Sequence, residues 1–479
     1  MVSLRGYESW ARVAAALWLV ACDGSHGGDA GADGGRRDAG PDAAAIDAGP
    51  RDAGPDAGPA PPGDALADDV CAHDGAVAVA EDGARAAYVT CGAERAVWTI
   101  ALFDGAPIRI DDAVAQTTVR FSPNGTWLLY GPPTAMRLRP VDASSPAVVI
   151  GSMDEARFVV VDPTASPEVR LLVLASAGGG RRITMRSDAD GFIAEANLAD
   201  DPGIRGDLSL VSGSRNTLLF VLETAGAQSY QRVATDGASA AAPLPIDPRT
   251  TLYGPVALGD THGIAETTGG GLAFVEMATG TAATLESDGV VAGSPRFDVV
   301  DGSLGRFAYY LRNGSITRTL RDGSGTPTTL RATPSSDLAL SLDATRLVFS
   351  SGGRLSSIAL DGSGEVELME YGATTLDVAF SPDGAEVAAI DDGALTRAPI
   401  ATASMSDELE PSGVVSGSAA YDGGGRLVYR AAADAEGHAD VLRAAGATSS
   451  IAWNVDGWWP VDGNPRVIYR TRGGRLLAL

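Results

Sequence analysis

The groups of this chain that are best placed to share a proton or hold a metal ion lie together in one short stretch. Within AAADAEGHAD, the residues Asp434, Glu436, His438 and Asp440 set three carboxylates beside an imidazole. Such a set could ligate a metal ion or work as an acid–base pair. The stretch is rich in small residues, and loops lie at the surface by default, so we favour a solvated connection between strands. A metal site is the alternative interpretation, and no cofactor is expected.

Other sequence patterns that mark enzymes do not occur. The chain of 479 residues contains no lysine, which excludes Schiff-base chemistry and a lysine general base. No Gly-x-Ser-x-Gly, Cys-x-x-Cys or His-Glu-x-x-His motif is present. The stretch RSDADGFIAE around Asp188 and Asp190 approaches a calcium loop, but Arg186 stands where the first oxygen ligand is required. We interpret this stretch as a surface turn.

Aromatic residues are scarce, which makes the stretch AWNVDGWWPV the most informative one for binding. It contains Trp453, Asp456, Trp458 and Trp459, and we expect it to connect two successive repeated units. Exposed tryptophan is a common anchor for protein partners and for sugars. We therefore take these four residues as candidate ligand contacts. The alternative is that two of the three indoles pack between the repeated units.

The first 22 residues have the features of an export signal. An apolar run of nine residues, Val13 to Ala21, follows Arg5 and Arg12 and is too short to span a bilayer. The run ends in Leu-Val-Ala-Cys, which resembles the lipobox of bacterial lipoproteins. The resemblance implies that residues 1–21 are a signal peptide and that Cys22 carries the lipid. No later segment has spanning length, so the lipid anchor would be the chain's contact with the membrane.

Cys71 and Cys91 are the two cysteines that remain after lipidation of Cys22. In an exported protein, oxidation of such a pair is expected. We predict a disulfide that ties the segment before the first repeated unit to that unit.

Residues 22–66 are predicted to form a disordered tether. They contain a degenerate Asp-Ala-Gly-Pro repeat without a periodic apolar face, so they cannot bury enough surface to offset the entropy of ordering. Proline and like charge should keep the tether extended. The whole chain carries a formal net charge of −25, which disfavours nucleic acid and anionic lipid surfaces as partners.

Residues 67–479 consist of one repeated unit. A turn followed by an apolar strand recurs about every 42 residues, as in DGAEVAAI, DGGGRLVYR and DGNPRVIYR. Asp-Gly and Asn-Gly suit tight hairpins, and the alternation after each turn indicates a half-buried strand. A second turn follows many of these about 20 residues later, which gives four strands in a unit, the size of a propeller blade.

An open stack of such units would leave strand edges unpaired, so we expect the chain to close into a ring. The fold class is therefore all-β, a β-propeller of four-stranded antiparallel blades, about eight to ten in number. The last unit stops at Leu479, one strand short. We expect the segment before Glu81 to supply the missing strand.

Three stretches carry a family resemblance. FSPDG from Phe380, FSPNG from Phe121 and LSLDATRLVF from Leu340 resemble the repeats of TolB-type, WD-like periplasmic propellers. The resemblance covers about Ala76 to Leu479 and implies a propeller located in the cell envelope. The α/β domain that precedes the propeller in that family is missing, and fold alone does not fix function, so the family's role is not carried over.

Two functions follow as hypotheses. The favoured one is a membrane-anchored, extracytoplasmic binding or scaffold module whose partner is another envelope protein or a glycan. The alternative is a propeller enzyme, a glycan hydrolase or lyase, with paired carboxylates about 5–10 Å apart in the channel.

The lipobox resemblance predicts a processed and lipidated N-terminus. The mature protein should begin at Cys22 and carry the added mass of its acyl chains. Intact-mass measurement of protein purified with and without an inhibitor of lipoprotein signal peptidase tests this. An unmodified mature N-terminus at another residue would contradict the assignment.

Overall fold

The computed structural model describes residues 64–478 with short gaps, which are 93, 103–104, 162–167, 178, 206–216, 245–255, 259–261, 268, 277–278, 280, 301–302, 321–323, 342, 373–376, 403–405, 411, 416–417, 423, 434–438, 446–449, 453–454, 461–466 and 473. All described residues belong to one compact unit, residues 63–479. Cys22 and the predicted signal peptide and tether lie outside the described residues, apart from the last three tether positions. No helix in the described ranges is long and apolar enough to cross a membrane.

The described chain forms ten antiparallel sheets of three or four strands, which we number as blades 1 to 10. Blades 1 to 3 comprise β2 (Val77–Val79), β3 (Arg85–Val89), β4 (Ala96–Ala101) and β5 (Ile108–Asp112); β6 (Thr118–Phe121), β7 (Trp127–Gly131), β8 (Met136–Pro140) and β9 (Val148–Gly151); and β10 (Glu155–Val161), β11 (Glu168–Ala177), β12 (Gly180–Ser187) and β13 (Ala196–Asp201). Blades 4 and 5 comprise β14 (Thr217–Thr224), β15 (Ala227–Ala234) and β16 (Ala242–Pro243); and β17 (Val256–Leu258), β18 (His262–Thr267), β19 (Gly271–Glu276) and β20 (Ala282–Glu286).

The second half repeats this plan. Blades 6 to 8 comprise β21 (Arg296–Val300), β22 (Ser303–Arg312), β23 (Ser315–Leu320) and β24 (Thr328–Arg331); β25 (Asp337–Leu340), β26 (Arg346–Ser351), β27 (Arg354–Ala359) and β28 (Val366–Glu370); and β29 (Asp377–Phe380), β30 (Glu386–Asp391), β31 (Ala394–Pro399) and β32 (Asp407–Glu410). Blades 9 and 10 comprise β33 (Ala420–Tyr421), β34 (Leu427–Ala433) and β35 (Ala439–Ala444); and β36 (Val455–Pro460), β37 (Val467–Thr471), β38 (Leu476–Ala478) and β1 (Asp64–Ala67).

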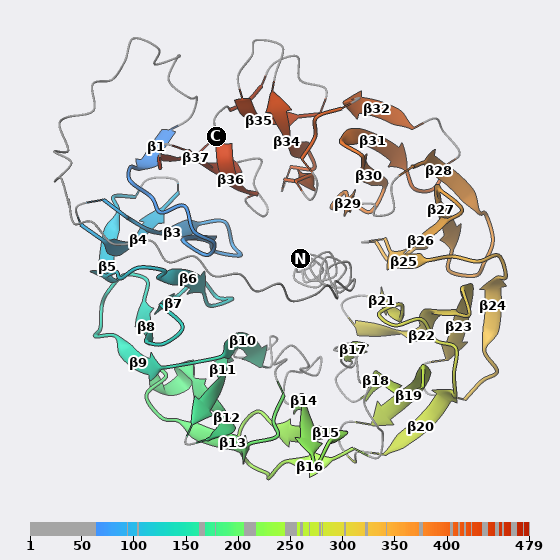
Figure 1. Cartoon of the computed structure of the whole chain (residues 1–479), viewed down its shortest axis with the longest axis horizontal. Helices are drawn as coiled ribbons and strands as arrows, with labels where there is room; N and C mark the ends of the chain where they lie inside the picture. The colour runs from blue at the N-terminus through green and yellow to red at the C-terminus, as the bar shows by residue number, and fades with distance from the viewer. Residues whose placement is uncertain are drawn as a thin grey trace, which may run out of the picture. The chain divides into compact units, whose positions relative to one another are not determined.

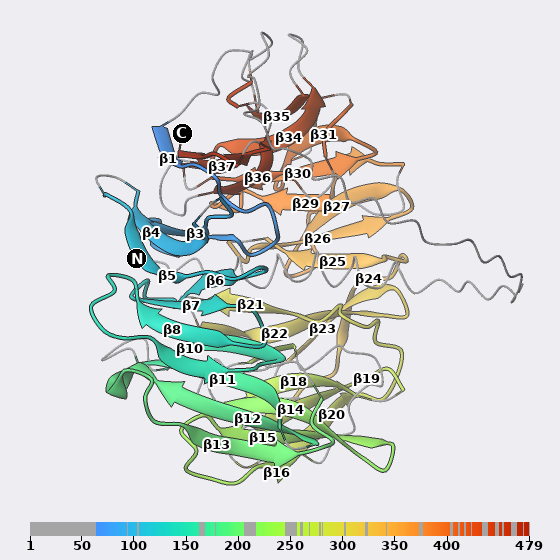
Figure 2. The ribbon, with the colours of Figure 1, turned by 60° about the vertical axis from the view of Figure 1, so that its left-hand side comes forward.

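Within this unit the blades follow one another around a ring (Figure 1). The first strand of each blade, such as β10, β25 or β29, lies nearest the centre, and the last, such as β9, β20 or β24, lies at the rim. Figure 2 shows the strands of blades 1, 2 and 3 stacked one above another on one side. The architecture is the β-propeller that the repeats predicted, with ten sheets among the described residues.

The ring is closed by the N-terminal strand. β1 pairs antiparallel with β38, in the register Asp64↔Ala478 and Ala65↔Leu477, and so becomes the outermost strand of blade 10. The fourth strand missing from the last repeat is therefore supplied from the other end, as the sequence predicted. β1 begins at Asp64, so the propeller starts three residues before the predicted boundary at residue 67.

Residues 68–76, between β1 and β2, form what we call the closing segment. It contacts the last and the first blade together: Val70 donates its N–H to the carbonyl of Gly474 at 2.7 Å, and Cys71 donates to that of Val89 at 2.8 Å. Arg475 also pairs with Asp68 at 3.2 Å. The closing segment is thus joined by backbone hydrogen bonds to the last blade and to the first blade.

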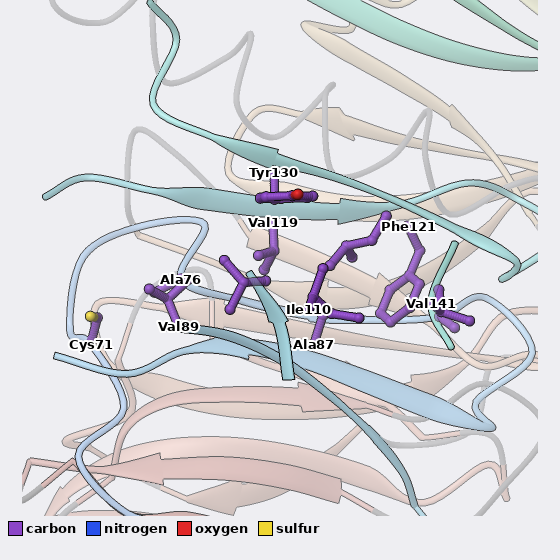
Figure 3. Close-up of a cluster of buried hydrophobic side chains, with 12 residues drawn as sticks. Cys71, Ala76, Ala87, Val89, Ile110, Val119, Phe121, Tyr130 and Val141 are labelled. Atoms are coloured by element: carbon purple, nitrogen blue, oxygen red, sulfur yellow. The ribbon is translucent and has the colours of Figure 1, made fainter. Parts of the chain in front are cut away.

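Apolar clusters fill the spaces between adjacent blades. In the cluster of Figure 3, Val119, Phe121 and Tyr130 of blade 2 pack against Val89 and Ile110 of blade 1. This is the core expected of strands that alternate buried residues on both faces. Because each blade has an apolar face on either side, it needs a neighbour on either side.

A hydrogen bond recurs between neighbouring blades at the same position of the third strand. The fourth residue of β4, of β23 and of β27 donates its side chain to the carbonyl just beyond the third strand of the next blade. The pairs are Thr99 with Val141, Arg318 with Leu360 and Ser357 with Ile400, at 2.8, 3.0 and 2.5 Å. The repeat therefore fixes polar as well as apolar contacts between blades.

The Ser-x-Asp/Asn turns of the repeat are held by the same two side chains in three blades. The serine Oγ donates to the carboxylate or amide oxygen two residues on, and accepts the N–H of the residue that opens the second strand. The pairs are Ser122–Asn124, Ser341–Asp343 and Ser381–Asp383, all at 2.6 Å. The next residue has positive φ, which glycine adopts freely. It is glycine at 125 and 384 but alanine at 344, with φ of 53°.

This contrast predicts opposite effects of two substitutions. Ala344→Gly should raise the free energy of unfolding by about 0.5–1 kcal/mol, because the strain of a left-handed alanine exceeds the entropy that glycine adds to the unfolded chain. Gly384→Ala should lower it by at least about 1 kcal/mol, since a Cβ there would also lie 2.7 Å from the backbone nitrogen of Asp343. Urea unfolding midpoints of the two variants test the pair, and shifts of the same sign would contradict it.

Candidate functional site

Three of the four candidate binding residues are described, and they lie in a strand. Asp456, Trp458 and Trp459 belong to β36, the first strand of blade 10, and Trp453 lies outside the described residues. The expectation that these tryptophans form a loop between blades is therefore corrected for Trp458 and Trp459. The reason is that residues 455–460 pair with β37, from Val455↔Thr471 to Pro460↔Val467.

Trp458 and Trp459 are half-buried and serve two different blade contacts. Adjacent residues of a strand point to opposite faces. Trp458 packs against the cluster between blades 9 and 10 that contains Val428 and Tyr469. Trp459 packs toward blade 1, against the cluster of Tyr88. Both indoles thus contribute to the packing between blades, which is the alternative that the sequence left open for two of the three.

Asp456 is engaged in an ion pair with a buried arginine. Its carboxylate lies 2.8 Å from Nε of Arg470, whose side chain is 8% exposed. Arg470 also donates to the backbone carbonyls of Cys71 and Ala72 in the closing segment, the latter at 3.1 Å. A buried guanidinium needs such partners, because an uncompensated charge is costly. Asp456 therefore supports the closure of the ring, through Arg470.

Asp440 is the one described member of the predicted acid–imidazole stretch, since Asp434, Glu436 and His438 lie outside the described residues. Its carboxylate lies 2.5 Å from Arg472 of blade 10 and 3.8 Å from Arg430 of its own blade. The backbone of Asp440 has positive φ, at 50°. Because Asp440 has a guanidinium partner on each of blades 9 and 10, we interpret it as a link between these blades.

Cys71 and Cys91 are joined by a disulfide, with their Cα atoms 5.1 Å apart. The bond connects the closing segment to the connection between β3 and β4. Nearby, Nε2 of His73 lies 2.7 Å from the carbonyl oxygen of Thr117, which precedes β6 of blade 2. The closing segment is therefore attached to blades 10, 1 and 2.

Sequence reasoning did not single out Arg470, His73 or Thr117. Arg470 is an arginine within the buried strand VIYRT, and that is a signal in itself, because arginine is almost never buried without a partner. His73 and Thr117 are 44 residues apart, and no local pattern relates them.

Carboxylates near the ends of several rim strands also form contacts with the next blade. In three places a tyrosine of the next blade donates its hydroxyl to such a carboxylate, and an arginine of the next blade pairs with it. The sets are Tyr130–Asp111–Arg137, Tyr310–Glu286–Arg312 and Tyr429–Glu410–Arg443, with tyrosine distances of 2.6, 2.7 and 3.2 Å. Where blade 7 has Phe349 instead, Arg331 of the preceding rim strand lies over the ring at 4.6 Å.

The electrostatics of the first of these sets favour cohesion. Burial and the hydrogen bond to Asp111 raise the pKa of Tyr130, so its phenol stays a neutral donor. Burial alone would raise the pKa of Asp111, but hydrogen bonds from Tyr130 and Arg137 outweigh it and lower that pKa. The carboxylate is therefore held ionised between two donors.

In the stretch RSDADGFIAE, which approaches a calcium loop in sequence, Asp188–Asp190 form a short 3-10 helix. Asp188 accepts the N–H of Val169, and Asp190 accepts those of Ile193 and Ala194. The carboxylates thus hold the turn through backbone donors, in line with the predicted surface turn.

A groove of about 490 Å³ lies at the rim between blades 3 and 4. Its walls are β13, with Asn197 and Asp200, and residues 237–241, and Phe220 and Gln231 contribute from blade 4. Asp200 is paired with Arg182 at 2.8 Å, and the Gln231 amide donates to Ser229 at 2.9 Å.

No protein-family model and no curated protein matches this chain. Among solved structures, a crystal structure of the eukaryotic initiation factor is 13% identical, with a TM-score of 0.40, over 70% of this chain and 88% of that one. The WD40 domain of SCAP from fission yeast is 10% identical, with a TM-score of 0.38, over 86% and 94%. Dipeptidyl peptidase 4 of Porphyromonas gingivalis is 9% identical, with a TM-score of 0.39, over 74% and 57%. At these values the likeness carries no statement about function.

The half-buried positions of the two tryptophans predict a loss of stability on truncation. Trp458→Ala and Trp459→Ala should each lower the free energy of unfolding by about 2–3 kcal/mol, below the range for fully buried tryptophan because part of each ring stays exposed. Val149→Ala is the control, since that side chain is 68% exposed and its loss should change stability by less than about 0.5 kcal/mol. Unchanged unfolding midpoints for both tryptophan variants would contradict the packing role and would favour the interpretation that these residues contact a ligand.

Proposed function

We propose that this protein is a lipid-anchored, extracytoplasmic β-propeller that acts as a binding or scaffold module of the cell envelope. Cys22 would hold it at a membrane, and residues 22–63 would space the ring from that membrane. Its partner would be another envelope protein or a glycan. The lipobox resemblance supports the anchor, and the disulfide supports the location, because disulfides persist in oxidising compartments outside the cytoplasm.

The observation that favours binding over catalysis is that two acidic side chains on the strands nearest the centre already have partners. Asp456 is paired with Arg470. Asp337, the first residue of β25, accepts the hydroxyls of Ser336 and Ser350. Glycan hydrolysis requires one carboxyl that stays protonated and a second that is free to act as base or nucleophile. Carboxylates that are already engaged by a buried arginine or by two hydroxyl groups are better suited to keep the inner strands in place.

Isolated cell-wall glycan distinguishes the two functions. Binding without turnover should retain the purified full chain on the glycan, or on envelope protein bound to it, and leave the number of reducing ends unchanged over hours. Asp337→Asn is the informative variant, because it removes the charge and keeps an acceptor for the two serine hydroxyls.

Release of reducing ends by the wild type, lost in Asp337→Asn with the unfolding midpoint unchanged, would establish the glycan enzyme instead. Equal release by the wild type and by Asp337→Asn excludes Asp337 as a catalytic acid. A second preparation, from a host that lacks glycan hydrolases, then decides whether the activity belongs to this chain or to a contaminant.

A further inference from the structure

Three metal-ligating groups meet at the closure of the ring. One ligand atom from each of Cys71, His73 and Cys91 lies within 4.8 Å of the other two. Two of the groups come from the closing segment, and the third comes from the connection between β3 and β4. Cysteine thiolate and imidazole are the ligands that Zn²⁺ prefers in proteins.

One ring nitrogen of His73 is engaged by the backbone, which leaves the other as the possible ligand atom. Its Nε2 lies 2.7 Å from the carbonyl oxygen of Thr117, which can only accept a hydrogen bond. The proton of the neutral ring is therefore on Nε2, and the lone pair is on Nδ1. A metal-binding histidine is commonly held in this way, with its other ring nitrogen donating to a backbone carbonyl. Thr117 is 1% exposed, so this acceptor is fixed in the packed start of blade 2.

The two sulfurs differ in access. Cys71 is 2% exposed, at the edge of the cluster between blades 1 and 2, whereas Cys91 is exposed. A reductant can therefore approach the disulfide from the side of Cys91, which makes Cys71 the leaving thiolate. The backbone bonds from Cys71 to Val89 and from Cys91 to Asp69 keep the two residues opposite each other without the covalent bond.

We propose that, once the disulfide is reduced, Cys71, Cys91 and His73 bind a zinc ion that takes over the link across the closure. Reduction converts the S–S bond to two thiols. A dithiol supplies two electrons and two protons and becomes its own disulfide. A phosphine supplies two electrons, and one water molecule supplies the two protons and the oxygen of the phosphine oxide. Zn²⁺ then displaces the two thiol protons and binds two thiolates and the imidazole. A water molecule completes the tetrahedral set, as in sites with three protein ligands.

The metal link should be measurable as stability. Reduction removes the covalent link between the closing segment and blade 1, so the reduced ring should melt at a lower temperature than the oxidised one. A ligand that binds the folded state alone stabilises it by RT ln(1 + L/Kd), where L is the free ligand concentration, so the melting temperature rises with the logarithm of that concentration once it exceeds Kd. Zinc should therefore restore part of the loss in reduced protein and have no effect on oxidised protein.

The test uses the full chain in a Cys22→Ser background, so that Cys71 and Cys91 are the only cysteines. Protein reduced with a phosphine under anaerobic conditions is titrated with Co²⁺ and then with Zn²⁺. We expect one equivalent of Co²⁺, with thiolate-to-cobalt charge-transfer absorption that one equivalent of Zn²⁺ abolishes. The oxidised protein should give no such absorption.

Variants at the imidazole separate a metal site from a simple dithiol. His73→Ala, and His73→Gln, whose amide can still donate to Thr117, should each weaken Zn²⁺ binding by at least tenfold and remove the zinc-dependent rise in melting temperature. His262→Ala, in β18 of blade 5, is the matched control and should bind Zn²⁺ as the parent does. Circular dichroism of each reduced variant establishes that it is folded.

Absence of Co²⁺ absorption in the reduced parent would overturn the proposal. So would an affinity that is the same in both His73 variants, or equal binding by oxidised and reduced protein.

Discussion

Closure of the ring is the constraint on which the rest of the structure depends. Each blade carries apolar residues on both faces, so it is stable only between two neighbours, and an open row would leave two faces exposed. The pairing of β1 with β38 connects the first and last blades, and an apolar cluster that includes Tyr88 and Ile468 covers the two faces between them. Around it, Val70 holds Gly474, Arg470 holds the carbonyls of Cys71 and Ala72, and a disulfide holds Cys91. Covalent, ionic and backbone links therefore concentrate at the one place where chain continuity does not keep neighbouring blades together.

Elsewhere, the contacts between blades are built from a small set of interchangeable pairs. A tyrosine hydroxyl meets a carboxylate at the end of the preceding rim strand, as between Tyr130 and Asp111. Where the aromatic residue has no hydroxyl, as at Phe349, the preceding strand offers the cation of Arg331 instead. In both arrangements the charged group of one blade has a partner on the next blade, as expected from the cost of burying an unpaired charge. Many acids and arginines of this acidic chain thus work between blades.

The position of β1 relates the ring to its proposed anchor. The propeller begins at Asp64, directly after the stretch that we interpret as a tether. A pull on that tether would act first on the outermost strand of blade 10. The disulfide lies only seven residues further on, and it fixes the closing segment to blade 1. We regard this placement as suited to a module held at a membrane, because loss of β1 from the sheet would stop at Cys71.

The sequence by itself determined the repeat, the all-β class, the propeller and the origin of the closing strand. These follow from local signals: turn residues such as Asp383, alternation along each strand, and a last unit that ends one strand short. It also selected the two cysteines that pair, because the lipobox resemblance set Cys22 apart from them. Tertiary structure alone decided what Trp458 and Trp459 contact, since a run of aromatic residues reads the same in a loop as in an inner strand. It alone joined Arg470 to Cys71, and His73 to Thr117. The first pair lies 399 residues apart and meets only because the ring closes. The second pair lies 44 residues apart and meets because the closing segment packs against the neighbouring blade 2.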